Sequence, residues 1–94
     1  MGFDYHAPRW KRLRWAVLTA AGYRCQYFRR FGKIVEADRV HHIWPVEQYP
    51  EYAWQRWNLI ALSLEAHRRM HKPDGTLSAE GEALRRRTIP PDRR

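Results

Sequence analysis

The sequence predicts a small α+β domain of 94 residues. Three observations support this class: a helical spacing of apolar residues near the N-terminus, two short apolar and β-branched runs, and a helix signal directly after the second run. No apolar run approaches the ~18 residues of a membrane span, and no secretory signal opens the chain. We therefore expect a cytoplasmic, monomeric single domain over 1–94, away from membranes. Its core would cover about 10–72, with a basic C-terminal helix and tail over 76–94.

The N-terminal third predicts one helix. After a short arm over residues 1–8, apolar side chains recur at near 3.6-residue spacing from about Arg9 to Ala21, and Gly22 ends the pattern. The basic side chains of this segment fall largely outside the apolar stripe. A mixed segment and a turn at Gly32 follow. The stripe consists of Trp10, Leu13, Val17, Ala20 and Ala21.

Two short strands and a helix are predicted in the middle of the chain. Residues 34–43 read as extended, and "NLIALS", residues 58–63, reads as a second strand. Ser63 suits the N-cap of a helix over about 64–72, which Pro73 ends. We expect the aromatic side chains of the intervening loop to pack against the domain, with stacking on bases as the alternative. They are Trp44, Tyr49, Tyr52, Trp54 and Trp57.

The last part of the chain predicts one further helix. It would cover residues 79–87, with Ser78 as its N-cap. The tail from Thr88 onward is expected to be extended and mobile.

The charge of the chain is strongly basic. Eighteen Lys and Arg oppose ten Asp and Glu, which gives a formal net charge of +8. Arg, the more frequent of the two, suits bidentate contacts with phosphate. Because neutralised phosphates release counterions, this charge favours nucleic acid as the partner over a merely soluble basic protein. The arginine runs 85–87 and 93–94 would add diffuse attraction to DNA.

Four of the five histidines lie in two tight groups. His41 and His42 are adjacent in "RVHHIWP", and neighbouring side chains of a strand point to opposite faces. One of them can therefore bind a metal while the other carries out acid–base chemistry. His67 and His71, in "AHRRMH", would share one face of the predicted helix and could bind the same ion. The alternative is a set of core histidines satisfied by hydrogen bonds; His6 lies outside both groups.

The order of these histidines, with one asparagine between them, resembles the HNH endonucleases and their ββα-metal motif. The segments "GYRCQ", "VHHIWP", "WNLIALS" and "AHRRMH" sit where small phage-type and bacterial members carry similar stretches. The resemblance implies an α+β ββα-metal fold with flanking helices. It also implies site roles: His41, His67 and His71 as metal ligands, His42 as general base, and Asn58 as the residue that holds the loop and thereby His42.

The resemblance covers roughly residues 10–71 and implies a metal-dependent DNA endonuclease that leaves a 3′-hydroxyl and a 5′-phosphate. The chemistry agrees, because phosphodiester hydrolysis needs a cation on the phosphate and a base with a pKa near neutral, such as histidine at ~6.5. Imidazole ligands favour one Zn²⁺, Ni²⁺, Co²⁺ or Mn²⁺ over Mg²⁺. The family also suggests a phage association and a DNA-packaging terminase as partner.

One departure from the family concerns cysteine. Many members carry two C-x2-C pairs that bind a structural zinc, but the matching positions here read Cys25-x2-Phe28 and Ser63-x2-Ala66. We therefore expect no structural zinc knuckle, and an apolar cluster of Cys25, Phe28 and Ala66 in its place. Catalysis by the Cys25 thiol is the less favoured alternative, because the histidines already have a task.

Further residues could contact phosphates near the histidines: Arg39, Arg68, Arg69 and Lys72. A solvated helix face explains the last three equally well. Two other functions remain open at this point. One is a non-catalytic basic DNA-binding module with a structural metal, for which His42 would be superfluous. The other is an accessory or inhibitor protein that binds a protein partner through its aromatic loop. RNA also remains open as a substrate.

Overall fold

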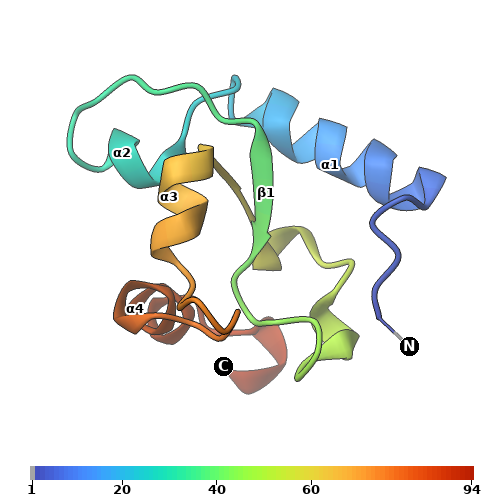
Figure 1. Ribbon diagram of the computed structural model, residues 1–94. Helices are drawn as coiled ribbons and strands as arrows, with labels where there is room; N and C mark the ends of the chain where they lie inside the picture. The colour runs from blue at the N-terminus through green and yellow to red at the C-terminus, as the bar shows by residue number, and fades with distance from the viewer. Residues whose placement is uncertain (1) are drawn as a thin grey trace.

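An antiparallel hairpin occupies the centre of the molecule (Figure 1). In the computed structural model, which describes residues 2–94, β1 (Arg39–His42) pairs with β2 (Leu59–Leu62). His41 lies opposite Ile60, and His42 lies opposite Leu59. The register thus fixes the histidine pair at the end of β1 where the long loop to β2 begins.

The first predicted strand is shorter than expected. Only Arg39–His42 pairs with β2, because the preceding residues bond to the segment that follows the first helix. Cys25 donates its N–H to the carbonyl of Val35 over 2.7 Å, and Ala37 donates to Tyr23 over 2.8 Å. The expected extended run from residue 34 is therefore divided between two partners.

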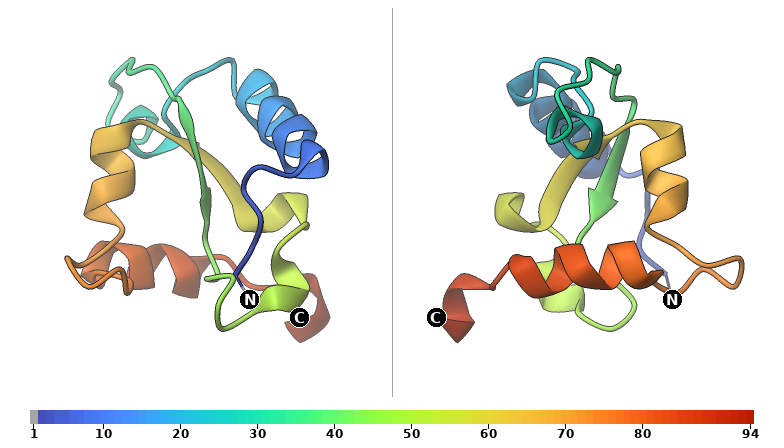
Figure 2. Two further views of the ribbon diagram at one scale, coloured as in Figure 1. Left: turned by 45° about the vertical axis from the view of Figure 1, so that its right-hand side comes forward. Right: turned by 90° about the vertical axis from the view of Figure 1, so that its left-hand side faces the viewer.

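Helices α1 (Pro8–Ala20) and α3 (Leu64–Arg69) lie on opposite sides of this hairpin (Figures 1 and 2). The predicted N-terminal helix is confirmed to within a residue at each end. It begins at Pro8, whose missing N–H is no loss in a first turn. It ends before Gly22, whose φ of +61° is a conformation that glycine adopts without a steric penalty.

Helix α3 begins as predicted but ends early. The Ser63 hydroxyl accepts the N–H of Ala66 at 3.2 Å, which confirms the cap. The placement of His71 on the helix is wrong, because α3 ends at Arg69. Pro73 has no N–H to donate to the Arg69 carbonyl, and the Ser78 hydroxyl donates to that carbonyl instead.

Helix α4 (Ala79–Arg87) lies across the end of the hairpin (Figure 2). Ser78 caps it as predicted, accepting the N–H of Gly81 at 3.1 Å. Ser78 also donates its backbone N–H to the carbonyl of Met70 over 2.9 Å. The start of α4 is therefore bonded directly to the end of α3.

The expectation of an extended, mobile tail is wrong. The indole Nε1 of Trp44 donates to the carbonyl of Thr88 over 2.7 Å, and the Tyr52 hydroxyl donates to Asp92 over 3.0 Å. The Arg93 guanidinium lies over the Trp44 ring, 4.8 Å from its centroid. The tail is held because the loop aromatics, which pack as predicted, turn their polar ends toward it.

The predicted apolar cluster of Cys25, Phe28 and Ala66 is confirmed. Cys25, Phe28 and Ala66 all lie in the main core cluster, and the exposed fractions of Cys25 and Ala66 are 0%. Phe28 enters this cluster from α2 (Gln26–Arg29), a short helix within the segment expected to be mixed. Among residues 2–94, no helix has the length and apolar character that crossing a membrane requires.

Candidate active site

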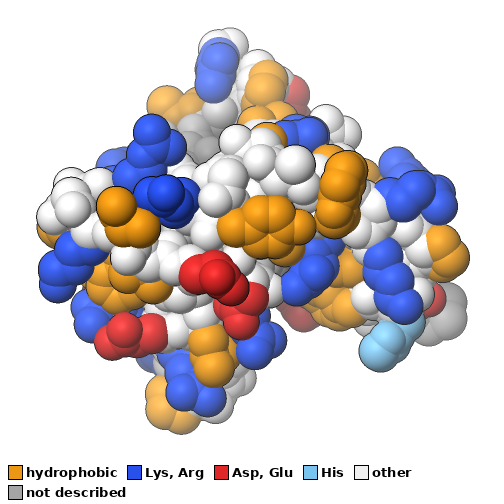
Figure 3. All heavy atoms as spheres, turned by 90° about the horizontal axis from the view of Figure 1, so that it is seen from above, with side chains coloured by type: hydrophobic (Ala, Val, Ile, Leu, Met, Phe, Trp, Pro, Cys, Tyr) orange, Lys and Arg blue, Asp and Glu red, His pale blue; other side chains and the backbone are white. Residues whose placement is uncertain are grey.

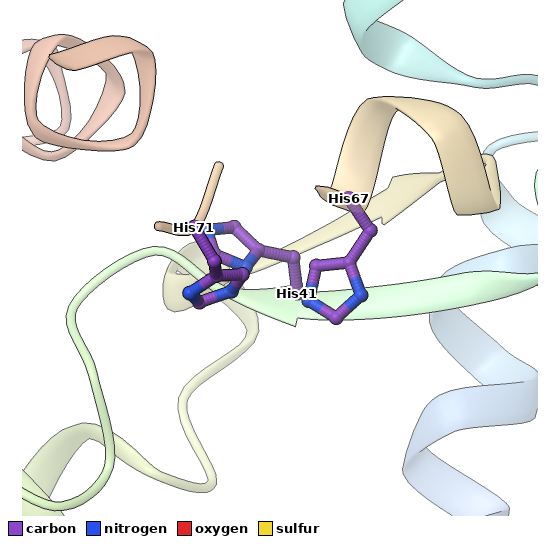
Figure 4. Close-up of side chains that lie close together, drawn as sticks. All are labelled: His41, His67 and His71. Atoms are coloured by element: carbon purple, nitrogen blue, oxygen red, sulfur yellow. The ribbon is translucent and has the colours of Figure 1, made fainter. Parts of the chain in front are cut away.

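Three imidazoles converge beside the hairpin (Figure 4). His41 comes from β1, His67 from α3, and His71 from the segment directly after α3. Their ring centroids lie 5.0 to 5.2 Å apart in all three pairs. One nitrogen from each ring lies within 4.8 Å of the other two, so the three side chains could hold one metal ion. His71 belongs to this group although it lies beyond the end of α3.

The burial of His41 suits a metal ligand. Its exposed fraction is 1%, and its Nε2 is the one buried side-chain N or O atom in residues 2–94 without a hydrogen-bond partner. A buried polar atom without a partner costs about 1–3 kcal/mol. His71 is oriented by its Nδ1, which lies 3.1 Å from the Gly75 carbonyl and so must carry the proton. That tautomer leaves Nε2 of His71 free to coordinate.

Two of the three imidazoles are in the protonation state that ligation requires. Burial lowers the pKa of His41 well below its ordinary 6.5, and the neighbouring His67 and His71 lower it further. Burial, with the nearby His71 and Arg39, lowers the pKa of His67 to about 4. Both imidazoles are therefore neutral at pH 7, as metal binding demands.

His42 lies on the other face of the strand, as the alternation of side chains predicts. Its ring stacks on Trp10, and Phe3 packs against it with 5.3 Å between centroids. Nε2 of His42 lies 3.0 Å from the carbonyl oxygen of Ala53, which can only accept, so Nε2 carries the proton and Nδ1 is free to take one. Burial lowers the pKa of His42, while the Ala53 carbonyl and the Glu47 carboxylate oppose that shift.

Asn58 holds both parts of the loop between the strands. It is fully buried, and its Oδ1 accepts the N–H of Trp44 at 2.7 Å. Its Nδ2 donates to the carbonyls of Trp44 and Tyr52 over 3.1 and 3.2 Å. The Tyr52 bond anchors the chain next to Ala53, whose carbonyl orients His42.

A solved structure is similar to this chain. No family model matches the sequence, and neither does any curated protein. The HNH endonuclease of deep-sea thermophilic bacteriophage GVE2, crystallised with a manganese ion, is 35% identical and superposes with a TM-score of 0.67. The match covers 69% of this chain and 71% of the phage protein. The chain belongs to the HNH endonuclease family. The predicted family and α+β class are thereby confirmed.

The basic candidates of this HNH endonuclease fall into two groups. Arg68 and Lys72 line an open hollow together with His67 and His71. Arg39, at the start of β1, lies close enough to His67 to lower its pKa. The guanidinium of Arg69 lies elsewhere, 3.1 Å from a carboxylate oxygen of Glu65 and over the ring of Phe28.

Sequence reasoning missed the surroundings of His42. Trp10 was assigned to the apolar stripe of a helix, and the arm that carries Phe3 was given no role. The density of aromatic residues between positions 3 and 10 was a usable signal of a packed site. The carbonyl of Ala53 has no sequence signal, because every residue supplies one.

Proposed function

We propose that this HNH endonuclease hydrolyses phosphodiester bonds of DNA with one divalent ion held by His41, His67 and His71. The partnerless Nε2 of His41 within the three-histidine cluster is the observation that carries the proposal. Imidazole ligands favour Zn²⁺, Ni²⁺, Co²⁺ or Mn²⁺ over Mg²⁺. The manganese ion in the phage relative makes Mn²⁺ the first choice among them.

When bound, the ion supplies positive charge to the phosphate and to the leaving oxygen. His42 acts as general base: its Nδ1 takes a proton from the attacking water, while Nε2 stays bonded to Ala53. Departure of the 3′-oxygen gives a 3′-hydroxyl and a 5′-phosphate. The fixed tautomer supports this role, because Nδ1 needs no rearrangement before it accepts the proton.

Asn58 acts as a positioning residue. Its bonds to Trp44 and Tyr52 hold the loop in one conformation and so keep the Ala53 carbonyl in place for His42. The DNA backbone is contacted by Arg39, Arg68 and Lys72, the cations near the histidine group. The guanidinium of Arg69 pairs with the Glu65 carboxylate, so Arg69 contributes less to DNA binding than these three residues. Action beside a DNA-packaging terminase stays a prediction.

A plasmid assay tests this function. Supercoiled DNA is incubated with wild type and His42→Ala, each with Mn²⁺, Mg²⁺, Ni²⁺ or Zn²⁺ and with a chelator. His6→Ala is the matched control, since His6 is exposed and outside the cluster. We expect metal-dependent nicking by wild type and His6→Ala, and loss of nicking in His42→Ala. DNA binding without cleavage under any metal would favour the non-catalytic module instead.

A further inference from the structure

We propose that the exposed face of α1 is a second DNA-binding surface, which holds the sugar–phosphate backbone beside the cleaved bond. This inference rests on the proposed function, since it takes DNA as the substrate. Four cations and no carboxylate lie in α1: Arg9, Lys11, Arg12 and Arg14. None of them takes part in an ion pair within residues 2–94. Their charge is therefore available to an external anion.

Two contacts align α1 with the strand that carries the histidines. Near its start, Trp10 stacks on His42 at the end of β1. One turn later, Arg14 donates from Nη2 to the carbonyl of Asp38, directly before β1, over 2.6 Å. The first half of α1 thus lies beside β1, with the start of the helix near the end of the strand. DNA that reaches His42 would therefore also lie near α1.

One carboxylate lies between Arg39 and the cations of α1. Asp38 is followed by Arg39, the first residue of β1, and the side chains of these two form an exposed ion pair at 3.8 Å. Figure 3 shows Lys and Arg side chains on the right of the molecule, where α1 lies, and further ones on the left, with acidic side chains near the centre. A polyanion that runs from Arg39 to α1 passes the Asp38 carboxylate, which Arg39 already pairs with, and then meets a helix without acidic side chains.

Trp15 gives this face a contact beyond charge. Its exposed fraction is 62%, whereas Trp10 and Trp44 are almost completely buried. Lys11 and Arg12 lie four and three residues before it, so all three side chains share one helix face. An indole one turn beyond two cations can lie against a base or sugar while the cations bond to neighbouring phosphates. An exposed tryptophan contributes little to the core, which favours a role in binding.

A binding experiment tests this surface independently of cleavage. The full chain is titrated, with a chelator present, against a fluorescent duplex of about two helical turns over a range of salt concentrations. Lys11→Gln with Arg12→Gln is compared with Arg29→Gln with Lys33→Gln, which removes the same charge from exposed positions outside α1. Trp15→Ala is compared with Phe31→Ala, whose ring is 60% exposed and lies outside α1. Thermal melts check that each variant is folded.

We expect the α1 charge pair to bind at least about tenfold more weakly at 0.1 M salt, with a salt slope shallower by about 1.8. The control pair should change by less than about threefold. Trp15→Ala should weaken binding by at least about fivefold, and Phe31→Ala should not. Equal weakening in both charge pairs, or equal effects of the two aromatic changes, would overturn the proposal. Binding through α1 by a chain that nicks no plasmid would contradict the proposed function alone.

Discussion

The ring of Trp10 lies nearly parallel to the ring of His42, with 5.0 Å between centroids and 20° between the planes. This contact joins α1 to the end of β1. Together with the bond from Nε2 to the Ala53 carbonyl, it fixes both the plane of the imidazole and the rotation of its nitrogens. The orientation of the proposed base is thus set by a core tryptophan.

Trp10→Leu should lower the single-turnover rate of DNA cleavage by tenfold or more. A general base displaced by about 1 Å can lose up to about 10²-fold in rate. Leu18→Ala is the matched control, because it also removes buried volume from α1, in which Leu18 is 3% exposed. Both variants are assayed at a temperature where circular dichroism shows them folded. Equal rates in the two variants would contradict a positioning role for Trp10.

His67→Ala should abolish tight Mn²⁺ binding, whereas His42→Ala and His6→Ala should retain it. The reason is that His67 contributes one of three converging nitrogens, and His42 faces the other side of the strand. Isothermal titration calorimetry measures the affinity and the stoichiometry, which should be about one ion per chain in wild type. Retained affinity in His67→Ala would remove the three-histidine site.

The free energy of unfolding of the metal-free protein should fall as the pH is lowered from 6.5 toward 4. In this window the unfolded chain protonates its histidines, whereas folded His67, with its pKa lowered to about 4, stays neutral. The unfolded state therefore binds more protons, so stability rises with pH. Urea unfolding at a series of pH values measures the slope. His67→Gln should show a shallower slope, and an unchanged slope would argue against the lowered pKa.

Asn58→Asp should lower the cleavage rate and the stability while metal binding is kept. The carboxylate retains an acceptor for the Trp44 N–H but cannot donate to the carbonyls of Trp44 and Tyr52. Each buried carbonyl left without its donor costs about 1–3 kcal/mol. Urea unfolding, calorimetry and plasmid nicking separate the three effects. An Asn58→Asp protein with wild-type nicking would show that the loop needs no amide.

Gly81→Ala should destabilise the fold by about 2 kcal/mol, despite the better helix propensity of alanine. An added Cβ would lie 2.2 Å from the Met70 carbonyl oxygen, which already accepts the Ser78 N–H. Gly2→Ala is the control, since no atom lies within 4 Å of its added Cβ. Thermal melts measure the stability of both variants. Equal melting temperatures would mean that α4 shifts to accommodate the added methyl group.

The sequence was informative where structure follows from local rules. Ser63 and Ser78 each cap a helix by accepting the N–H of the residue three positions later, so their identity and position were enough to predict the caps. The opposite orientation of His41 and His42 followed from strand geometry alone. The four-residue spacing of His67 and His71 likewise predicted that their rings meet, although the predicted helix extends past Arg69, where α3 ends.

Long-range bonds account for what the sequence left undetermined. The end of α3 depends on Ser78 reaching back to Arg69 and Met70, which no window of neighbouring residues reveals. The tail is held by Trp44, across more than forty residues of chain. The stack of Trp10 on His42 is also a tertiary contact. A helical stripe shows which side chains are buried but not what they touch.

The burial of Cys25 in an apolar cluster with Phe28 and Ala66 has a practical consequence for spectroscopy. In this chain the one thiol is buried, and in residues 2–94 the three histidines form the one group of His, Cys, Asp or Glu side chains that could hold a metal ion. The visible absorption of added Co²⁺ would therefore report the coordination of the histidine site alone, free of sulfur-to-metal charge transfer.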